Sequence, residues 1–184
     1  MARLGLDPAL RTLVAMGGSQ GARSINDALI RLVEERAVPA GWQVFALTGA
    51  LDFDRVRASL PNAQAYLDEM ADAYAAADLV LARAGASTLS ELAALGKPAI
   101  LIPYPYAAQR HQARNAQRFE AAGAAVVLTD RLLQAEGLTA VLERTVRPQR
   151  LQALAAGAAR LVADDPLHAI LARIDALTSR KARR

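Results

Sequence analysis

The chain has 184 residues, which is enough for one ordinary domain. Its residues are 53% hydrophobic and 22% charged, a balance typical of a globular protein with a sizeable core. There is no cysteine, so disulfides, thiolate metal sites and a cysteine nucleophile are excluded, and this absence fits a reducing cytoplasm. His111 and His168 are the two histidines of the chain, which excludes a multi-histidine metal site.

The net charge of +4 and the hydropathy pattern limit the partners. Much of the positive charge lies in residues 180–184, and such a basic end either touches nucleic acid or anionic lipid or is a frayed, solvated terminus. Elsewhere the two signs are mixed and no basic stripe carries interleaved aromatic residues, so we expect no nucleic-acid partner. No apolar run reaches the roughly 18 to 20 residues of a membrane-spanning helix.

Short apolar runs alternate with helical segments along the chain. The runs are bounded by glycine, proline or polar residues, and their length is typical of buried strands. We predict strands at 12–16, 43–48, 63–67, 79–82, 99–102 and 124–128. We predict helices at 22–35, 52–60, 70–77, 109–122, 138–144, 148–163 and 166–177, and one that Ser87 or Thr88 caps and that ends at residue 95.

This alternation predicts an α/β fold, a doubly wound parallel six-stranded sheet with helices on both faces. The default strand order is then 3-2-1-4-5-6. That order places the first and fourth strands side by side where the winding reverses, and ligands of open α/β sheets bind in the crevice beyond such strand ends. Because the turns at 17–22 and 83–88 follow these two strands, we expect both turns to face one crevice.

The first of these turns is rich in glycine and begins a helix. Glycines let the backbone turn sharply and let an anion come close, and the helix start directs unpaired N–H groups at that anion. The string is not a Walker loop, since no lysine follows its last glycine. It predicts a phosphate cradle or, alternatively, a tight turn that only packs a helix on the sheet. The residues of the predicted cradle are Gly17, Gly18, Ser19, Gln20 and Gly21.

The second turn aims another helix start at the same crevice, and two such starts suit a diphosphate. Glu91 lies about one turn inside the second helix. A carboxylate there either accepts bonds from both hydroxyls of a ribose or only complements the helix dipole. The residues of this predicted second helix start are Gly85, Ala86, Ser87 and Thr88.

A polar segment after the fifth predicted strand borders the crevice as well. It offers His111, Gln112 and Asn115 near the start of a helix. Such donors and acceptors bind sugars, and the alternative for His111 is a solvated surface residue. As a general base, His111 would need a substrate hydroxyl within reach.

Four strings in this order resemble the MurG family, the UDP-N-acetylglucosamine transferases of peptidoglycan synthesis. They are Gly-Gly-Ser-Gln-Gly-Ala-Arg at 17–23, Ala-Asp-Leu-Val-Leu-Ala-Arg-Ala-Gly-Ala-Ser-Thr-Leu-Ser-Glu-Leu at 77–92, Gly-Lys-Pro-Ala-Ile-Leu-Ile-Pro-Tyr-Pro at 96–105 and His-Gln-Ala-Arg-Asn-Ala at 111–116. Their order and spacing match over roughly residues 10–175. The resemblance implies one half of a GT-B glycosyltransferase with two Rossmann-like domains, and this chain is similar to the C-terminal half.

The resemblance also implies a role for each predicted site residue. It places the UDP-N-acetylglucosamine (UDP-GlcNAc) diphosphate on the cradle and on the second helix start. Leu67 and Met70 would pack against the uracil, and Glu91 would take the ribose hydroxyls. His111 and Gln112 would contact the hydroxyls of GlcNAc.

The chemistry implied is inverting transfer of GlcNAc to lipid I, which makes lipid II. Ser19 and the two helix starts would stabilise the leaving diphosphate, so we expect no cofactor and no metal. The acceptor, the membrane contact and the catalytic residues are expected on an N-terminal domain of similar size. We therefore expect this chain alone to bind the donor weakly and to transfer nothing.

The resemblance divides the chain into residues 1–10, a remnant of an interdomain linker, residues 11–178, the UDP-GlcNAc-binding domain, and residues 179–184, the basic tail. We expect a piece of a longer enzyme that is peripheral at the cytoplasmic face of the bacterial inner membrane. The alternatives are a subunit of a split glycosyltransferase, an enzyme of the same superfamily for another activated sugar, and a nucleotide-binding module without catalysis.

Overall fold

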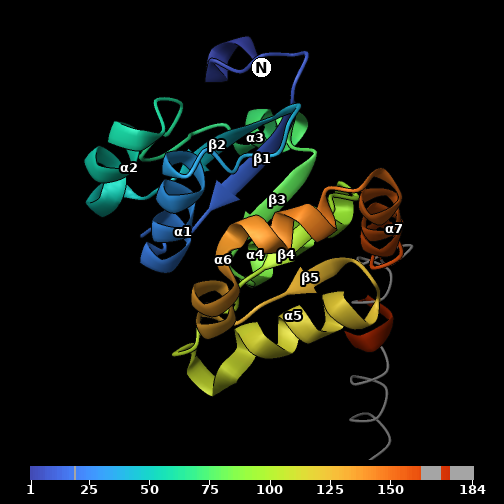
Figure 1. Cartoon of the computed structure of the whole chain (residues 1–184). Helices are drawn as coiled ribbons and strands as arrows, with labels where there is room; N and C mark the ends of the chain where they lie inside the picture. Colours follow the sequence, from blue (N-terminus) through green and yellow to red (C-terminus); the bar gives the residue numbers. More distant parts are fainter. Residues whose placement is uncertain (19, 163–170, 175–184) are drawn as a thin grey trace, which may run out of the picture.

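The computed structural model describes residues 1–18, 20–162 and 171–174. Within them, five parallel strands form one sheet in the order β2-β1-β3-β4-β5 (Figure 1). The bounds are β1 (Arg11–Met16), β2 (Trp42–Leu47), β3 (Leu79–Ala82), β4 (Ala99–Leu101) and β5 (Ala125–Val127).

The doubly wound order is confirmed, but the third predicted strand at 63–67 is wrong. This segment pairs with β2 through an isolated bridge between Leu47 and Gln64. The N–H of Gln64 donates to the carbonyl of Ala46 at 2.9 Å, and its carbonyl accepts from Thr48 at 3.0 Å. Alanine favours strands poorly, and a turn comes directly before, so pairing does not extend. The sheet therefore has five strands rather than six, with the bridged segment at the edge beside β2.

Helices cover both faces of the sheet, as Figure 1 shows. Helices α3, α4 and α5 bury apolar residues against one face, and α1, α2 and α6 bury theirs against the other. The bounds of the helices are α1 (Arg23–Glu34), α2 (Phe53–Ser59), α3 (Met70–Ala76), α4 (Ala86–Ala94), α5 (His111–Ala121), α6 (Asp130–Thr145) and α7 (Pro148–Ala159), with short 3-10 turns η1 (Ala2–Leu4), η2 (Ala50–Asp52) and η3 (Ala108–Arg110).

Strand alternation builds the two cores. In β1, Val14 and Met16 face the core under α3, α4 and α5, whereas Leu13 and Ala15 face the core under α1 and α6. Successive side chains of a strand point to opposite faces, so a continuous apolar run is the signature of a sheet covered on both sides. This is why the short apolar runs predicted most of the sheet.

Two helix boundaries differ from the predicted ones. Helix α4 begins at Ala86 with Gly85 as its N-cap, so Ser87 and Thr88 lie inside its first turn and the predicted side-chain cap is wrong. Helix α6 is interrupted at Gly137, whose φ of 75° and ψ of 155° are not helical, so the part after this kink agrees with the predicted helix at 138–144. The part before the kink was not predicted, and the Thr129 hydroxyl caps it by accepting a bond from the N–H of Leu132 at 3.1 Å. The predicted helix at 166–177 and the basic tail at 179–184 lie largely or wholly outside the described residues.

The first ten residues pack onto the domain. The side chains of Leu4 and Leu6 are buried and join the core on the α3 side of the sheet. The Arg3 guanidinium lies 3.6 Å from the carboxylate of Asp72 on α3. In the described part of the chain, no helix has both the length and the apolar character needed to cross a membrane.

The buried face of α4 provides a test of this packing. Leu92 is fully buried, whereas Leu95 at the end of the same helix is 52% exposed. We expect Leu92→Ala to lower the free energy of unfolding by about 2–5 kcal/mol, because it removes packed atoms and leaves a cavity. Leu95→Ala should change it by less than about 0.5 kcal/mol. Urea unfolding measures both, and equal effects would contradict this orientation of α4.

Candidate functional site

A cleft of about 700 Å³ opens where β1 and β3 end. Met16 and Ala82, the last residues of these strands, are register partners, so the turns that follow them leave the sheet side by side. The cleft is the predicted crevice at the winding reversal. Its described lining comes from five segments of the chain: Met16, Gly17, Gly18, Gln20, Gly21, Ala22, Arg23 and Ser24; Leu51; Arg83, Gly85 and Thr88; Tyr104, Pro105, Tyr106 and Gln112; and Asp130 and Gln134.

Glycine is required in the loop after β1 because neighbouring backbone approaches it closely. A Cβ built on Gly21 would lie 2.0 Å from the carbonyl oxygen of Thr48, and its φ of +77° is a left-handed value. Across this contact, a Cβ on Gly49 would lie 2.5 Å from the backbone nitrogen of Gly21. The loop after β1 therefore rests directly on the end of β2, and its path is fixed by backbone contact.

Two helices start at the cleft. Helix α1 begins at Arg23 after Ala22, and α4 begins at Ala86 after Gly85. The first N–H groups of a helix have no partner inside it, and the aligned peptide dipoles place about half a positive charge at that end. Both starts therefore offer donors and positive potential to a ligand in the cleft, as predicted for an anion site.

The charged side chains of the cleft reinforce this potential. Among the described lining residues these are Arg23, Arg83 and Asp130, which leaves a net positive charge. Arg83 is largely neutralised, because its guanidinium lies 3.0 and 3.1 Å from the two carboxylate oxygens of Asp130. Arg23 is exposed. It is thus Arg23 whose charge is available to a ligand.

Arg83 organises the floor of the cleft. It donates to the carbonyl of Ile102 at 3.1 Å and to the hydroxyl of Ser24 at 3.0 Å, and its guanidinium lies over the ring of Tyr104. The Ser24 hydroxyl in turn donates to Asp130. These contacts connect the ends of β3 and β4 with the starts of α1 and α6. A positioned arginine of this kind holds several loops in one arrangement.

An apolar pocket of about 190 Å³ adjoins the cleft. Met16, Gly18 and Thr88 line both, so the two spaces lie next to each other at these residues. Leu67 and Met70 are half-buried against the adjacent core. The remaining described lining residues are Leu47, Ala65, Tyr66, Tyr74 and Glu91. The pocket is therefore a mostly apolar slot with a carboxylate on its wall.

Glu91 is held by a buried tyrosine. The hydroxyl of Tyr74 donates to Oε2 of Glu91 at 2.6 Å, and it also lies 3.7 Å from the sulfur of Met16. Burial, and then the bond to the Glu91 carboxylate, raise the pKa of Tyr74, so the hydroxyl keeps its proton. The carboxylate accepts this bond at one oxygen and faces the pocket.

The loop between β4 and α5 forms the far wall of the cleft. Gln112 accepts a bond from the N–H of Tyr104 at 2.9 Å, which ties the start of α5 to this loop. Gln109 and Arg110 adopt left-handed φ values of 50° and 54° before the helix begins. His111 turns its Nδ1 to the carbonyl of Ala108 at 2.7 Å and lies in an outer groove beside Arg114 rather than in the cleft.

The predicted site residues divide by position. Seven line the cleft, namely Gly17, Gly18, Gln20, Gly21, Gly85, Thr88 and Gln112. Leu67, Met70 and Glu91 line the apolar pocket. Ala86 and Ser87 are exposed in the first turn of α4, and His111 lies outside the cleft. Ser19 lies outside the described residues.

Sequence reasoning missed Arg83, Asp130 and Tyr74 as site residues. A single charge directly after the apolar strand β3 was the available signal for Arg83. The partner of that charge is 47 positions away in the sequence, so no local pattern reveals it. Tyr74 gives a weaker signal, since an aromatic residue inside a short apolar helix usually belongs to the core.

The Asp-x-Asp string at 52–54 is of a kind that can hold a metal ion with its bound nucleotide sugar. Such a role would contradict the expectation that no metal is needed. Asp52 accepts bonds from the side chains of Asn26 at 3.0 Å and Arg55 at 3.2 Å. Asn26 also donates to the carbonyl of Thr48 at 3.1 Å. Asp52 thus braces the loop after β2 on which Gly21 rests.

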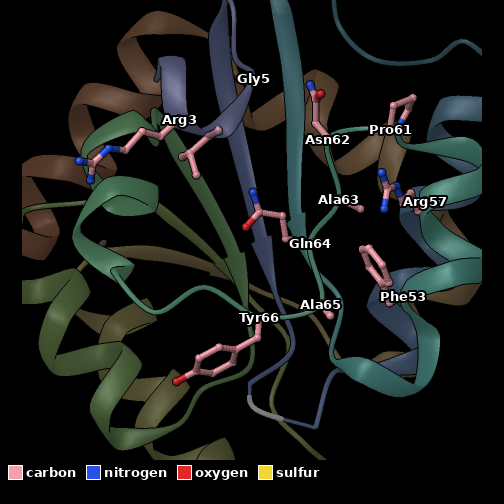
Figure 2. A pocket seen from close by; sticks show the side chains of 11 residues that line it. Arg3, Gly5, Phe53, Arg57, Pro61, Asn62, Ala63, Gln64, Ala65 and Tyr66 are labelled. Atoms are coloured by element: carbon pink, nitrogen blue, oxygen red, sulfur yellow. The ribbon is translucent and has the colours of Figure 1, made fainter.

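A second hollow, of about 600 Å³, lies along the sheet edge between the N-terminal turn and α2. Figure 2 shows Arg3 and Arg57 on opposite sides of it, with Gln64 between them. Arg3 is paired with Asp72, and Arg57 lies over the ring of Phe53. The two arginines of this hollow therefore do not point toward a common ligand position, and the cleft is the better candidate site.

Comparison with known proteins assigns the family. The profile of the glycosyltransferase family 28 C-terminal domain matches residues 12–166. The chain belongs to this family. The match contains both helix starts and the loop after β4, which line the cleft, and it also contains the apolar pocket beside the cleft.

Curated relatives and a solved structure agree. The chain is 42% identical to the UDP-N-acetylglucosamine--N-acetylmuramyl-(pentapeptide) pyrophosphoryl-undecaprenol N-acetylglucosamine transferase of Chlorobium limicola, covering 92% of this chain and 48% of the relative. It is 46% identical to the protein of that name from Chlorobaculum tepidum, covering 85% and 44%. The crystal structure of MurG from Acinetobacter baumannii superimposes with a TM-score of 0.73 at 28% identity, covering 88% and 48%. The chain thus spans about half the length of the relatives it matches.

The contact between Gly21 and Thr48 predicts a large effect of one methyl group. Gly21→Ala places a Cβ against the Thr48 carbonyl and forces a left-handed φ on alanine, so we expect it to cost about 2–4 kcal/mol. Gly41 is the matched control, since its φ is +78° with no atom within 4 Å of a built Cβ. Gly41→Ala should cost about 1 kcal/mol. Equal losses in denaturant unfolding would show that the loop contact constrains nothing.

Asp52 predicts a pH dependence of stability. The bond from Asn26 lowers the pKa of Asp52 below its ordinary value of 3.8, with help from Arg55. A lowered folded-state pKa stabilises the fold above the unfolded pKa, and this stabilisation is lost as the pH falls through the folded-state pKa. Asp52→Asn should therefore be less stable than the parent at pH 7, and the gap should close toward pH 3.

Urea midpoints measured between pH 7 and pH 3 test this dependence. The exposed neighbour Asp54 supplies the control variant Asp54→Asn, which should follow the parent at each pH. A gap between Asp52→Asn and the parent that stays constant with pH would contradict the assignment.

Proposed function

We propose that this chain binds the UDP-GlcNAc donor of a transferase of the kind for which its relatives are named. One observation carries the proposal. A cleft with two helix starts adjoins, at Gly18 and Thr88, an apolar pocket with Glu91 on its wall. A nucleoside diphosphate has the same order of parts, because a flat base and a ribose are followed by a doubly charged diphosphate.

The diphosphate belongs in the cleft, between the starts of α1 and α4. Unpaired N–H groups and the positive helix ends are directed there, and the Arg23 guanidinium adds a mobile charge. Negative charge grows on the diphosphate as the bond to the sugar breaks. Fixed amide dipoles stabilise this charge without reorganising, so the same groups that bind the donor also favour departure of UDP.

The nucleoside belongs in the apolar pocket. Leu67 and Met70 offer flat apolar contact to the uracil, and the Glu91 carboxylate accepts bonds from the ribose hydroxyls. The GlcNAc ring then extends along the cleft toward the loop after β4, where Gln112 presents its amide. His111 would reach the sugar only if its side chain left the Ala108 carbonyl.

The reaction proposed is attack by a hydroxyl of lipid I on the anomeric carbon of GlcNAc, with UDP leaving and the configuration inverting. The acceptor and the base that removes the hydroxyl proton would come from the N-terminal half of such a transferase, at the cytoplasmic face of the membrane. The two halves would close over the cleft for each transfer. Until they do, the donor stays bound beside water without an acceptor.

Titration calorimetry on this chain tests the donor assignment. We expect binding of UDP-GlcNAc, and weaker binding of UDP-glucose and UDP-galactose. Transfer to a lipid I analogue is expected once the N-terminal half of a relative is added, and not before. Absence of binding by all three nucleotide sugars would overturn the donor assignment. Turnover by the isolated chain would overturn the expectation that transfer needs the N-terminal half. Preference for another sugar would assign the chain to a different donor.

Glu91→Ala tests the ribose contact. We expect about a tenfold to hundredfold loss of affinity for every UDP ligand alike, because each loses the same charged hydrogen bonds. Glu143→Ala removes an exposed carboxylate on α6 and serves as the control. Unchanged UDP affinity in the Glu91 variant would show that the ribose lies elsewhere.

A further inference from the structure

Tyr74 on α3 is a buried polar group that none of the proposed ligand contacts uses. The residue is 4% exposed, yet its hydroxyl reaches the wall of the apolar pocket, 2.6 Å from Oε2 of Glu91. The two residues come from different helices, since Glu91 lies on α4. The contact therefore depends on how α3 and α4 pack together over the sheet.

Glu91 needs such a partner if it is to bind in one geometry. It is an exposed residue, and an exposed glutamate samples several rotamers, so ordering it on binding costs conformational entropy. The short bond from Tyr74 fixes one carboxylate oxygen before any ligand arrives. The lone pairs that remain, two on the other oxygen and one on Oε2, are then left to accept from the two ribose hydroxyls. This is preorganisation by a neighbouring donor.

The tyrosine is suited to donate rather than to accept. Burial and the adjacent carboxylate keep its hydroxyl protonated, as its raised pKa indicates. The sulfur of Met16 at 3.7 Å is a weak alternative acceptor, so the proton is directed at Glu91. Phenylalanine would keep the ring packing of Tyr74 and remove the bond to Glu91.

We propose that Tyr74 is a positioning residue for donor recognition, which orients the Glu91 carboxylate toward the two hydroxyls of the ribose. This inference rests on the proposed function, because it takes Glu91 as the ribose acceptor. It adds that the selectivity of the pocket for a ribose depends on a residue that does not touch the nucleotide.

The test compares two ligands on the parent chain and on Tyr74→Phe. The ligands are UDP and 2′,3′-dideoxyuridine diphosphate, which lacks both ribose hydroxyls. We expect Tyr74→Phe to weaken UDP binding about threefold to tenfold and to leave binding of the dideoxy ligand unchanged. Equal weakening of both ligands would assign Tyr74 a packing role and overturn the proposal, as would unchanged affinity for both.

A double-mutant cycle separates positioning from other effects. In the Glu91→Ala background, Tyr74→Phe should cause no further loss of UDP affinity, since the group it orients is gone. An additive loss would overturn the proposal. Thermal unfolding of each variant shows whether it is folded at the temperature of the titration, and a variant that is unfolded there is titrated at a lower temperature together with the parent.

The outcomes also distinguish this inference from the proposed function. If the parent chain binds neither UDP nor UDP-GlcNAc, the donor assignment fails. If the parent binds UDP, and Glu91→Ala weakens it while Tyr74→Phe does not, the donor assignment stands and the positioning role of Tyr74 fails.

Discussion

The contact between the loop after β1 and the end of β2 is the constraint on which the site depends. Gly21 lies against the Thr48 carbonyl and Gly49 lies against Gly21, at distances that no side chain tolerates. Asn26 and Asp52 brace the same carbonyl and the turn that follows it. With this loop fixed, the start of α1 has one direction relative to the sheet. Backbone packed against backbone therefore sets this side of the cleft, and the Asn26 and Asp52 side chains reinforce it.

The sheet and the cleft position followed from the sequence because both depend on local patterns. Apolar runs such as the one in β1 are buried on both faces, and glycine-rich turns mark where such strands stop. The segment at 63–67 does not form a full strand, because the turn before it and its alanines limit its pairing to one bridge. A prediction based on apolar residues alone does not take these two limits into account. Placement of Leu67 and Met70 beside Glu91 needed the family resemblance as well.

Long-range polar partners lay beyond what the sequence could predict. Arg83 with Asp130 and Tyr74 with Glu91 are pairs from separate elements, and each meets only after the helices pack on the sheet. Arg83 connects the loops at the floor of the cleft, and Tyr74 holds the carboxylate of Glu91. Sequence patterns identified residues that present backbone or charge to the cleft, and tertiary packing added the residues that hold them.

Gly18 has a different relation to the site from its neighbours. It lines both the cleft and the apolar pocket, its φ is +84°, and no atom lies within 4 Å of a Cβ built on it. Its glycine is thus demanded by backbone conformation and not by crowding. A side chain at this position would take up open space where the cleft and the pocket meet, so one glycine keeps both spaces free along their common border.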